Sequence, residues 1–488
     1  MKPLLSLALV LCSTSCVFVS KDEVSAAREQ GSAASNENAP SDGGQVLARI
    51  GDGKPICGLG KAFHAGRRAE LMKRAGEELL VFRGLPGQRD NLAFRQDKTF
   101  WYLTGVESPE AALVLDGKSK KEILFLPARN ERAESWDGEL WDDQDDWVKE
   151  LTGFVDVRPS EKLVETLQDL LEGRKKVGTM LGASFGLSGS YDSAGPYDEA
   201  QAADPLDGRP SREKALAAKL AEELDVEVFD VKDTLVDMRR IKTAEEIDAM
   251  RRAAHIGALA HIEAMRSTRP GLGEWELDAA MTFVQQREGA YGKAYEAIVG
   301  SAGNACILHY TDNSRRMGAG EVVLIDYGPE VDHYTTDITR SWPVDGKFSK
   351  RAAELYDAVL AAQKAGIAAA KPGVTLRDVD KACTAVLNER GFDRPLIKHG
   401  ACHYIGMEVH DPGDRKPVEP GVAFTVEPGL YDTEAGIGIR IEDVVIITAD
   451  GCEVISALAP KERADLEKLV GSGGVLERKE KTAASGTR

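Results

Sequence analysis

The chain has 488 residues, of which 29% are charged and 42% hydrophobic, and its formal net charge is -18. This length is too great for one ordinary domain and sufficient for two domains with sizeable cores, so we expect two. An acidic surface keeps a protein soluble and argues against a general basic surface for phosphates, so we expect no nucleic acid partner.

Residues 1–20 have the pattern of an export signal. Lys2 precedes an apolar stretch from Leu4 to Leu11, which is too short to span a bilayer. The small residues before Cys16 resemble a bacterial lipoprotein processing site, and cleavage as a simple secreted protein is the alternative. We therefore expect an exported protein of the bacterial cell envelope or periplasm, whose only membrane attachment would be a lipid anchor at Cys16.

A flexible linker and then an α/β domain are predicted next. Residues 21–59 are predicted to be the linker, because residues 21 to about 45 contain almost nothing large that could be buried. Residues 60–235 alternate between strand and helix patterns, with strands expected at 78–82, 111–115 and 122–126 and a helix from Ser160 to Gly173. Within this domain, residues 184–212 are rich in Gly, Asp and Pro and indicate a long surface insertion of unreadable role.

A second domain is predicted over residues 236–468. Thr243 and Glu246 have the spacing of a capping box, which predicts a long helix that ends before Pro270. Further helices are expected after Ser349 and Thr375, and strands are expected at 321–327, 333–342, 422–427 and 437–448. Residues 469–488 are predicted to be a disordered tail.

Five potential metal ligands fall on these strands or next to their ends: Asp326, Asp337, His403, Glu427 and Glu442. Any one of the acidic residues alone would be expected on the solvated surface. Asp326 and Glu427, however, each follow four strand residues of mainly apolar character, where an unpaired charge is poorly tolerated. The joint pattern therefore predicts a metal site.

Four converging carboxylates would repel one another strongly, and cations between them remove that cost. Two divalent ions about 3.5 to 4 Å apart neutralise four negative charges and can activate water for amide hydrolysis. A ligand set that is mostly oxygen with one imidazole favours manganese or cobalt over zinc, and we expect Mn²⁺.

These motifs together resemble the pita-bread metallopeptidase family, whose ligand order Asp, Asp, His, Glu, Glu is matched without a gap. The segments around His309, His399 and His410 resemble the family's other active-site histidines. In the N-terminal half, residues 94–97, 100–105 and 134–138 resemble the N-terminal domain of aminopeptidase P, of which prolidases share a looser version. The resemblance implies an α/β N-terminal domain, an α+β pita-bread catalytic domain and a homo-oligomer.

The resemblance also implies residue roles. Asp326 would ligate one metal and His403 the other, while Asp337 and Glu442 would bridge them. Glu427 would be both a ligand and the general base. His309, His399 and His410 would hold the substrate and stabilise the tetrahedral intermediate, and Arg440 would orient nearby acidic groups. Alternatively, the three histidines would be buried side chains hydrogen-bonded to backbone groups, and Arg440 would form an ordinary salt bridge on its strand. For His333 only a surface position is expected.

The implied activity is that of an Xaa-Pro aminopeptidase, which removes the first residue of a peptide whose second residue is proline. One alternative is an Xaa-Pro dipeptidase on the same fold, which has the same metals but a closed site. Another is a noncatalytic peptide-binding relative, which is disfavoured because no ligand is missing. The sequence leaves open the preferred first residue, the physiological peptide and the metal loaded in the cell.

Overall fold

The computed structural model describes residues 57–87, 93–138, 140–182, 190–393 and 395–477. The predicted export signal, Cys16, most of the predicted linker and residues 478–488 of the predicted tail lie outside the described residues. Within the described ranges, no helix combines the length and the apolar character that crossing a bilayer requires.

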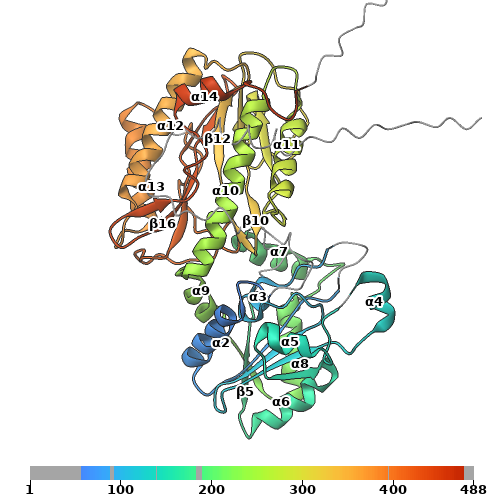
Figure 1. Ribbon diagram of the computed structural model, residues 1–488. Helices are drawn as coiled ribbons and strands as arrows, with labels where there is room; N and C mark the ends of the chain where they lie inside the picture. Colours follow the sequence, from blue (N-terminus) through green and yellow to red (C-terminus); the bar gives the residue numbers. More distant parts are fainter. Residues whose placement is uncertain (1–56, 88–92, 139, 183–189, 394, 478–488) are drawn as a thin grey trace, which may run out of the picture. The chain divides into compact units, whose positions relative to one another are not determined.

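The N-terminal half is built around one six-stranded sheet with the strand order β4-β3-β2-β1-β5-β6 (Figure 1). Strand β1 runs parallel to β5, β5 to β6 and β3 to β4, whereas β2 is antiparallel to both of its neighbours. The strands are β1 (Leu79–Arg83), β2 (Ala112–Asp116), β3 (Lys121–Leu126), β4 (Asp156–Pro159), β5 (Lys176–Thr179) and β6 (Glu227–Asp230). The predicted α/β domain is confirmed.

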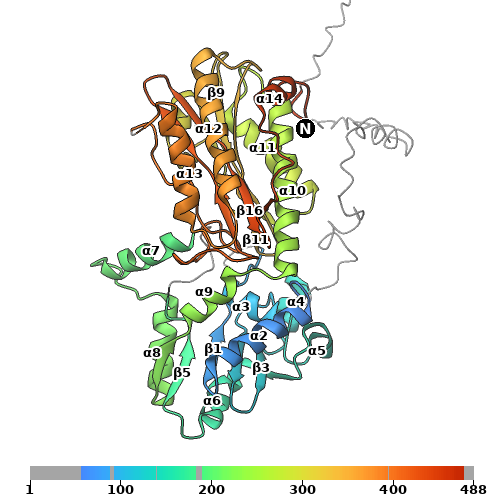
Figure 2. The same ribbon diagram turned by 90° about the vertical axis from the view of Figure 1, so that its left-hand side faces the viewer.

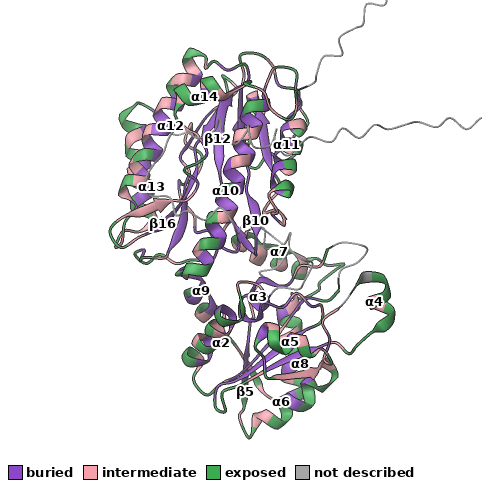
Figure 3. Ribbon diagram, in the orientation of Figure 1, coloured by how far each residue is buried: buried purple, intermediate pink, exposed green. Residues whose placement is uncertain are grey.

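Helices pack on both faces of this sheet. Because side chains alternate along a strand, Leu80 and Phe82 of β1 pack in one core with Phe100, whereas Leu79 and Val81 pack in another. The four inner strands, β1, β2, β3 and β5, are accordingly buried along most of their length, whereas the edge strands β4 and β6 are not (Figure 3). The helices of this half are α2 (Lys61–Ala75), α3 (Lys98–Thr104), α4 (Glu131–Asp137), α5 (Asp146–Thr152), α6 (Leu163–Leu171), α8 (Arg212–Leu224) and α9 (Lys232–Arg240).

The segment predicted as a surface insertion contains a further helix, α7 (Tyr191–Ala203), none of whose residues is buried. Its position at the surface agrees with the prediction. The helix itself was not predicted, because Gly195 and Pro196 lie inside it and such residues ordinarily interrupt helices.

The C-terminal half has three three-stranded sheets, in the orders β12-β9-β8, β13-β16-β17 and β11-β10-β7, and the pair β14-β15. Helices α10 and α11 flank the strands on one side and α12 and α13 on the other (Figures 1 and 2). The helices are α10 (Ala244–Ser267), α11 (Glu274–Arg287), α12 (Lys350–Ala369), α13 (Leu376–Glu389) and α14 (Arg463–Leu469). The strands are β7 (Gly292–Lys293), β8 (Ile298–Ser301), β9 (Val322–Asp326), β10 (Pro329–Val331), β11 (Tyr334–Thr335), β12 (Thr339–Pro343), β13 (Ala423–Val426), β14 (Gly429–Asp432), β15 (Ile437–Arg440), β16 (Asp443–Ile447) and β17 (Cys452–Val454).

The predicted helix starts are confirmed. The Thr243 side chain accepts from the Glu246 backbone N–H, and the Glu246 side chain accepts from the Thr243 N–H, which completes the capping box of α10. Ser349 and Thr375 cap α12 and α13 in the same way, each accepting from the backbone N–H three residues on.

Two strands that were predicted as continuous are each interrupted. The range 333–342 divides into β11 and β12, and the range 437–448 divides into β15 and β16. Asp337 lies in the first gap and Glu442 in the second. The Glu442 backbone N–H donates to the Thr339 carbonyl at 3.0 Å, so the two gaps are joined to each other.

His333 is buried, so its expected surface position was wrong. It forms with Asp332 the two-residue turn between β10 and β11, where both residues have positive φ (48° for Asp332 and 62° for His333), as a type I′ turn requires. The imidazole stacks on Trp101 at 4.3 Å, and its Nε2 lies 2.5 Å from Glu107 Oε1. Both partners come from the N-terminal half, which local sequence around His333 does not reveal.

Residues 470–477 lie against helix α10. The backbone N–H groups of Gly471 and Gly473 donate to carbonyls of Met265 and Arg266 at 3.1 and 3.2 Å, and the Val475 N–H donates to Glu263 Oε1 at 2.6 Å. The predicted tail thus includes a described part that is hydrogen-bonded to helix α10 of the C-terminal half.

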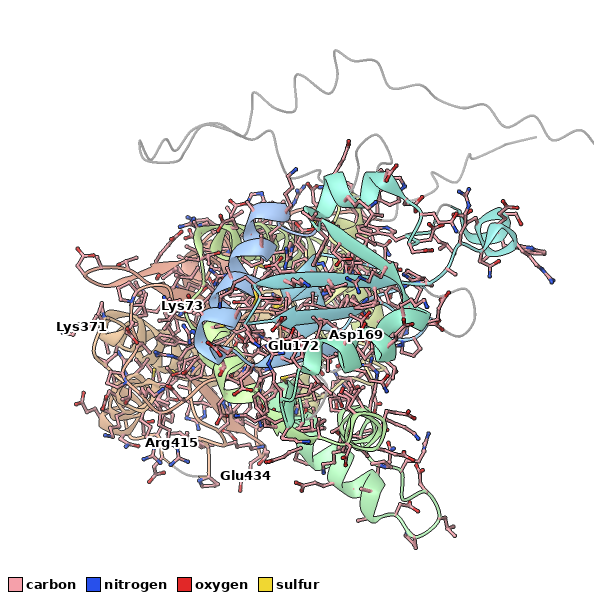
Figure 4. The ribbon with its side chains drawn as sticks, turned by 90° about the horizontal axis from the view of Figure 1, so that it is seen from below. Lys73, Asp169, Glu172, Lys371, Arg415 and Glu434 are labelled. Atoms are coloured by element: carbon pink, nitrogen blue, oxygen red, sulfur yellow. The ribbon has the colours of Figure 1, made fainter. Side chains whose placement is uncertain are left out.

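Charged side chains of both signs lie on the outside of the molecule. Those labelled in Figure 4 are all exposed: Lys73, Asp169, Glu172, Lys371, Arg415 and Glu434. Glu172 pairs with Lys118 at 2.7 Å, with both side chains more than half exposed. Solvent screens a pair as exposed as this, so it does little to hold the fold.

Candidate metal centre

The five predicted ligands line one cavity of about 360 Å³. Asp326 is the last residue of β9, Glu427 directly follows β13, and Asp337 and Glu442 occupy the two strand gaps. His403 precedes Tyr404, which bridges to Phe424 of β13. Strand ends thus fix all five side chains, and His309, His399, His410 and Arg440 line the same cavity.

His403 Nε2 lies among the carboxylates. It is 3.5 Å from Asp337 Oδ2, 3.4 Å from Glu427 Oε1 and 3.8 Å from Glu442 Oε1. Its Nδ1 lies 3.1 Å from the Tyr404 carbonyl, an acceptor that fixes the proton on Nδ1 and leaves Nε2 free to bind a metal. Ligand atoms of Asp337, His403 and Glu442 all lie within 4.8 Å of one another, a separation that one cation can span.

The carboxylates cannot all be ionised without added positive charge. Burial, and then the charge of Asp337, raise the pKa of Asp326 to about 8, and burial with the same neighbour raises the pKa of Glu442 well above its usual range. Burial opposes ionisation of Asp337 too, but hydrogen bonds from the imidazolium form of His403, which carries a proton on both nitrogens, and from Tyr295 hold the pKa of Asp337 at about 2.

The donor set fits two divalent cations. Four carboxylates carry four negative charges when ionised, and the buried Glu442 Oε1 has no hydrogen-bond partner among the described residues. A buried carboxylate oxygen left without a partner is costly, and a metal bond removes that cost. Oxygen donors with a single imidazole suit hard or borderline ions.

Arg440 connects the metal ligands to a network behind them. Its Nη2 donates to Asp326 Oδ2 at 2.6 Å, its Nε to Thr339 Oγ1 at 3.0 Å and its Nη1 to the Tyr431 hydroxyl at 3.0 Å. Thr339 Oγ1 in turn donates to Glu442 Oε2 at 2.7 Å. The guanidinium therefore orients two of the ligands, one directly and one through a hydroxyl, rather than forming an isolated strand salt bridge.

Tyr295 is a site residue that the sequence did not reveal. Its hydroxyl lies 2.6 Å from Asp337 Oδ1 and is also hydrogen-bonded to Asp326 Oδ1. A phenol has one proton, so it can donate to only one of these carboxylates at a time. Tyr295 follows β7, a strand of two residues without an apolar run, so no local pattern marks it.

The three predicted substrate histidines differ in their surroundings. The Nε2 of His399 lies 2.7 Å from the Tyr431 hydroxyl, and its Nδ1 lies 2.8 Å from a backbone carbonyl. The ring of His410 stacks on His403 with 4.0 Å between centroids. His309 is exposed and lines both the metal cavity and an adjacent cavity of about 210 Å³. The alternative of a buried histidine that is hydrogen-bonded to a backbone group therefore applies at most to His399.

The insertion also reaches the site. Ser190 lines the adjacent cavity and Asp192 lines the metal cavity. The Tyr191 backbone N–H donates to the His410 carbonyl at 2.9 Å. This role could not be predicted, because the segment's glycine, aspartate and proline content indicates only a loop.

Comparison with known proteins identifies the family. Residues 248–449 match the model of metallopeptidase family M24, and residues 64–178 match that of the aminopeptidase P N-terminal domain. An Xaa-Pro aminopeptidase of Escherichia coli K12 is 34% identical over 410 residues, which cover 77% of this chain and 89% of that protein. The chain belongs to metallopeptidase family M24. An Xaa-Pro aminopeptidase of Haemophilus influenzae is 33% identical over 431 residues, 80% of this M24 chain and 93% of that protein.

Solved structures of M24 enzymes have the same fold. Escherichia coli aminopeptidase P with the inhibitor Pro-Leu matches with a TM-score of 0.71 at 30% identity, covering 84% of this chain and 98% of that one. Proline aminopeptidase P II of Yersinia pestis matches with a TM-score of 0.69 at 32% identity, covering 84% and 99%. The α/β N-terminal domain and the pita-bread catalytic domain expected from the sequence are confirmed, and the M24 centre is one for two divalent metal ions.

Proposed function

We propose that this M24 metallopeptidase is an Xaa-Pro aminopeptidase, which hydrolyses the bond between the first residue of a peptide and a proline in second position. The observation that carries this proposal is the convergence of the five ligands with His309, His399, His410 and Arg440 on one cavity, in a chain that also has an aminopeptidase P N-terminal domain. Release of the first residue from an Xaa-Pro-Xaa tripeptide tests it.

Asp326, Asp337, His403, Glu427 and Glu442 would hold two divalent ions. When bound, such ions polarise the scissile carbonyl and lower the pKa of water to near neutrality. We propose that the ions are Mn²⁺, because four carboxylates and one imidazole suit manganese better than zinc. Metal analysis of protein purified without added metal would test that assignment.

We propose that Glu427 moves the proton that the reaction requires. Its two carboxylate oxygens lie 3.4 Å from His403 Nε2 and 3.7 Å from His399 Nδ1, at the wall of the cavity. A carboxylate there can take a proton from the attacking water and deliver it to the proline nitrogen, which must be protonated to leave as an amine.

The histidines provide hydrogen bonds to the substrate. His309, His399 and His410 line the cavity around the carboxylates, where imidazole nitrogens can bind peptide carbonyls and the oxyanion that forms during attack. Tyr431 contacts both His399 and Arg440, so it couples the orientation of a substrate histidine to that of Asp326.

We further propose that the protein is exported and acts in a bacterial cell envelope or periplasm, with Cys16 as a lipid attachment site. The residues from Lys2 to Cys16 support this. Incorporation of labelled palmitate that is lost in Cys16→Ser would test it. The likeness to aminopeptidase P supports a homo-oligomer, which light scattering on the purified protein would test.

A further inference from the structure

The N-terminal domain contains a cavity of about 440 Å³ that shares no lining residue with the metal cavity. It lies where the parallel strands β1 and β5 end, at Phe82 to Gly84 and at Thr179 and Met180. The first turns of α8 form another wall. In open sheets with parallel strands, ligands commonly bind beyond the carboxyl ends of those strands.

Two buried polar groups that line this cavity have hydrogen-bonding capacity to spare. Glu213 is 7% exposed and Thr99 is 3% exposed. Neither Glu213 Oε2 nor the Thr99 hydroxyl has a hydrogen-bond partner among the residues that the structure describes. Buried polar side-chain atoms nearly always have a partner, so two without one at the same cavity indicate a polar ligand.

A cation lies at the same cavity. The Arg83 guanidinium makes no hydrogen bond or ion pair with any described side chain or carbonyl. Arg212, in contrast, is engaged, because its Nη2 donates to the carbonyls of Arg83 (at 3.0 Å) and Gly84. Burial and the nearby charge of Arg212 lower the pKa of Arg83, and the carboxylate of Glu110 in the same cavity offsets this only in part, so a further anion beside this guanidinium would be stabilised.

The rest of the lining includes the apolar residues Phe82, Pro86, Met180, Ala215 and Leu216 and two further carboxylates, Glu110 and Asp97, of which Asp97 accepts from the Phe100 backbone N–H at 2.8 Å. A ligand that satisfies the whole cavity therefore carries an anionic group for Arg83, a cationic donor for Glu213 and Thr99, and an apolar part. Lys219 also lines the cavity but pairs with Glu222 at 2.7 Å, with its side chain 68% exposed.

We propose that this cavity binds a free α-amino acid with an apolar side chain, with its carboxylate on Arg83 and its ammonium on Glu213 and the Thr99 hydroxyl. Such a molecule is of the chemical class that an aminopeptidase releases, but the site is separate from the metal centre. Its occupancy depends on neither the metals nor the proposed activity.

Calorimetric titration of the full-length, manganese-loaded protein with leucine tests this proposal. Leucine can also bind the metal centre as a product, so the titration is repeated on Asp337→Ala, in which the metal centre is disrupted. We expect a binding event that persists in Asp337→Ala and is weakened about tenfold or more in Glu213→Gln and in Arg83→Gln. N-acetyl-leucine, which lacks the ammonium, and leucinamide, which lacks the carboxylate, should bind comparably weakly.

Glu165→Gln and Arg74→Gln are matched controls, because both residues are on exposed helix surfaces and neither they nor their ion-pair partners line the cavity, and they should leave leucine binding unchanged. If Arg83→Gln fails to fold, Arg83→Lys and Thr99→Val replace it. Arg83→Lys keeps the charge and should leave leucine binding unchanged, whereas the isosteric Thr99→Val lacks the hydroxyl and should weaken leucine binding. Absence of a binding event in Asp337→Ala, or binding that Glu213→Gln leaves intact, would overturn the proposal whether or not the enzyme cleaves Xaa-Pro peptides.

Discussion

Asp192 Oδ2 lies 3.2 Å from His410 Nδ1, although 218 residues separate them in the chain. A carboxylate at neutral pH only accepts hydrogen bonds, so this contact places the proton on Nδ1 and leaves Nε2 of His410 for the cavity. The adjacent Ser190 and Tyr191 hold the His410 backbone in a short parallel bridge. The insertion therefore orients a side chain of the metal cavity.

Replacement of Asp192 by Ala should reduce kcat/KM for an Xaa-Pro tripeptide about three- to tenfold, a modest loss because the carboxylate is 68% exposed. Metal content should not change. Glu199→Ala, at an exposed position of the same helix, is the control. In a His410→Ala background the Asp192 substitution should have no further effect. Equal losses in both backgrounds would show that Asp192 does not act through His410.

Tyr295→Phe keeps the ring and removes the hydroxyl that contacts Asp326 and Asp337. We expect kcat to fall about 10- to 100-fold and the protein to retain less metal, because the two ligands lose a shared donor. Tyr310→Phe is the control, since that buried hydroxyl donates to Glu274 at 3.0 Å instead. Unchanged activity and metal content in Tyr295→Phe would mean that the ligands are held without this donor.

Asp337→Ala and Glu427→Ala should each abolish turnover while leaving the fold intact, as measured by circular dichroism. Asp337 contributes to the group of ligand atoms within 4.8 Å, and Glu427 is the proposed base. Chelation should likewise abolish activity, and added manganese should restore it. An active Asp337→Ala protein would contradict the two-metal centre.

Glu213 should make stability depend on pH. Burial raises its pKa from 4.5 to about 7, so between these values the folded state holds a proton that the unfolded state has lost. This contribution to stability is present below about pH 4.5 and is lost as pH rises to about 7. The free energy of unfolding of Glu213→Gln, minus that of the wild type, should therefore rise over this range in urea titrations. Glu222→Gln should show no such rise, and a pH-independent difference for Glu213→Gln would refute the assignment.

The convergence of the five candidate metal ligands on one cavity could be predicted because their signals are local. Asp326 and Glu427 each end a buried strand that the sequence marks with apolar residues, and Thr243 with Glu246 marks the start of α10. The break between β15 and β16 could not be predicted, because apolar residues continue on both sides of Glu442.

The remaining site residues depend on contacts between distant segments. Tyr295 reaches Asp326 and Asp337 from a strand too short to show a pattern, and His333 is buried by residues of the other half of the chain. Asp192 lies in a helix that was not predicted because it contains a glycine and a proline. Tertiary packing, which the sequence does not display, places all three.

The most direct test of the proposed activity compares Xaa-Pro-Xaa tripeptides with Xaa-Pro dipeptides as substrates of the manganese-loaded protein, with the products identified by mass spectrometry. We predict that tripeptides are cleaved after their first residue, releasing a free amino acid and a dipeptide that begins with proline. Cleavage of dipeptides alone would make the enzyme an Xaa-Pro dipeptidase, and cleavage of neither by metal-loaded protein would contradict a catalytic role.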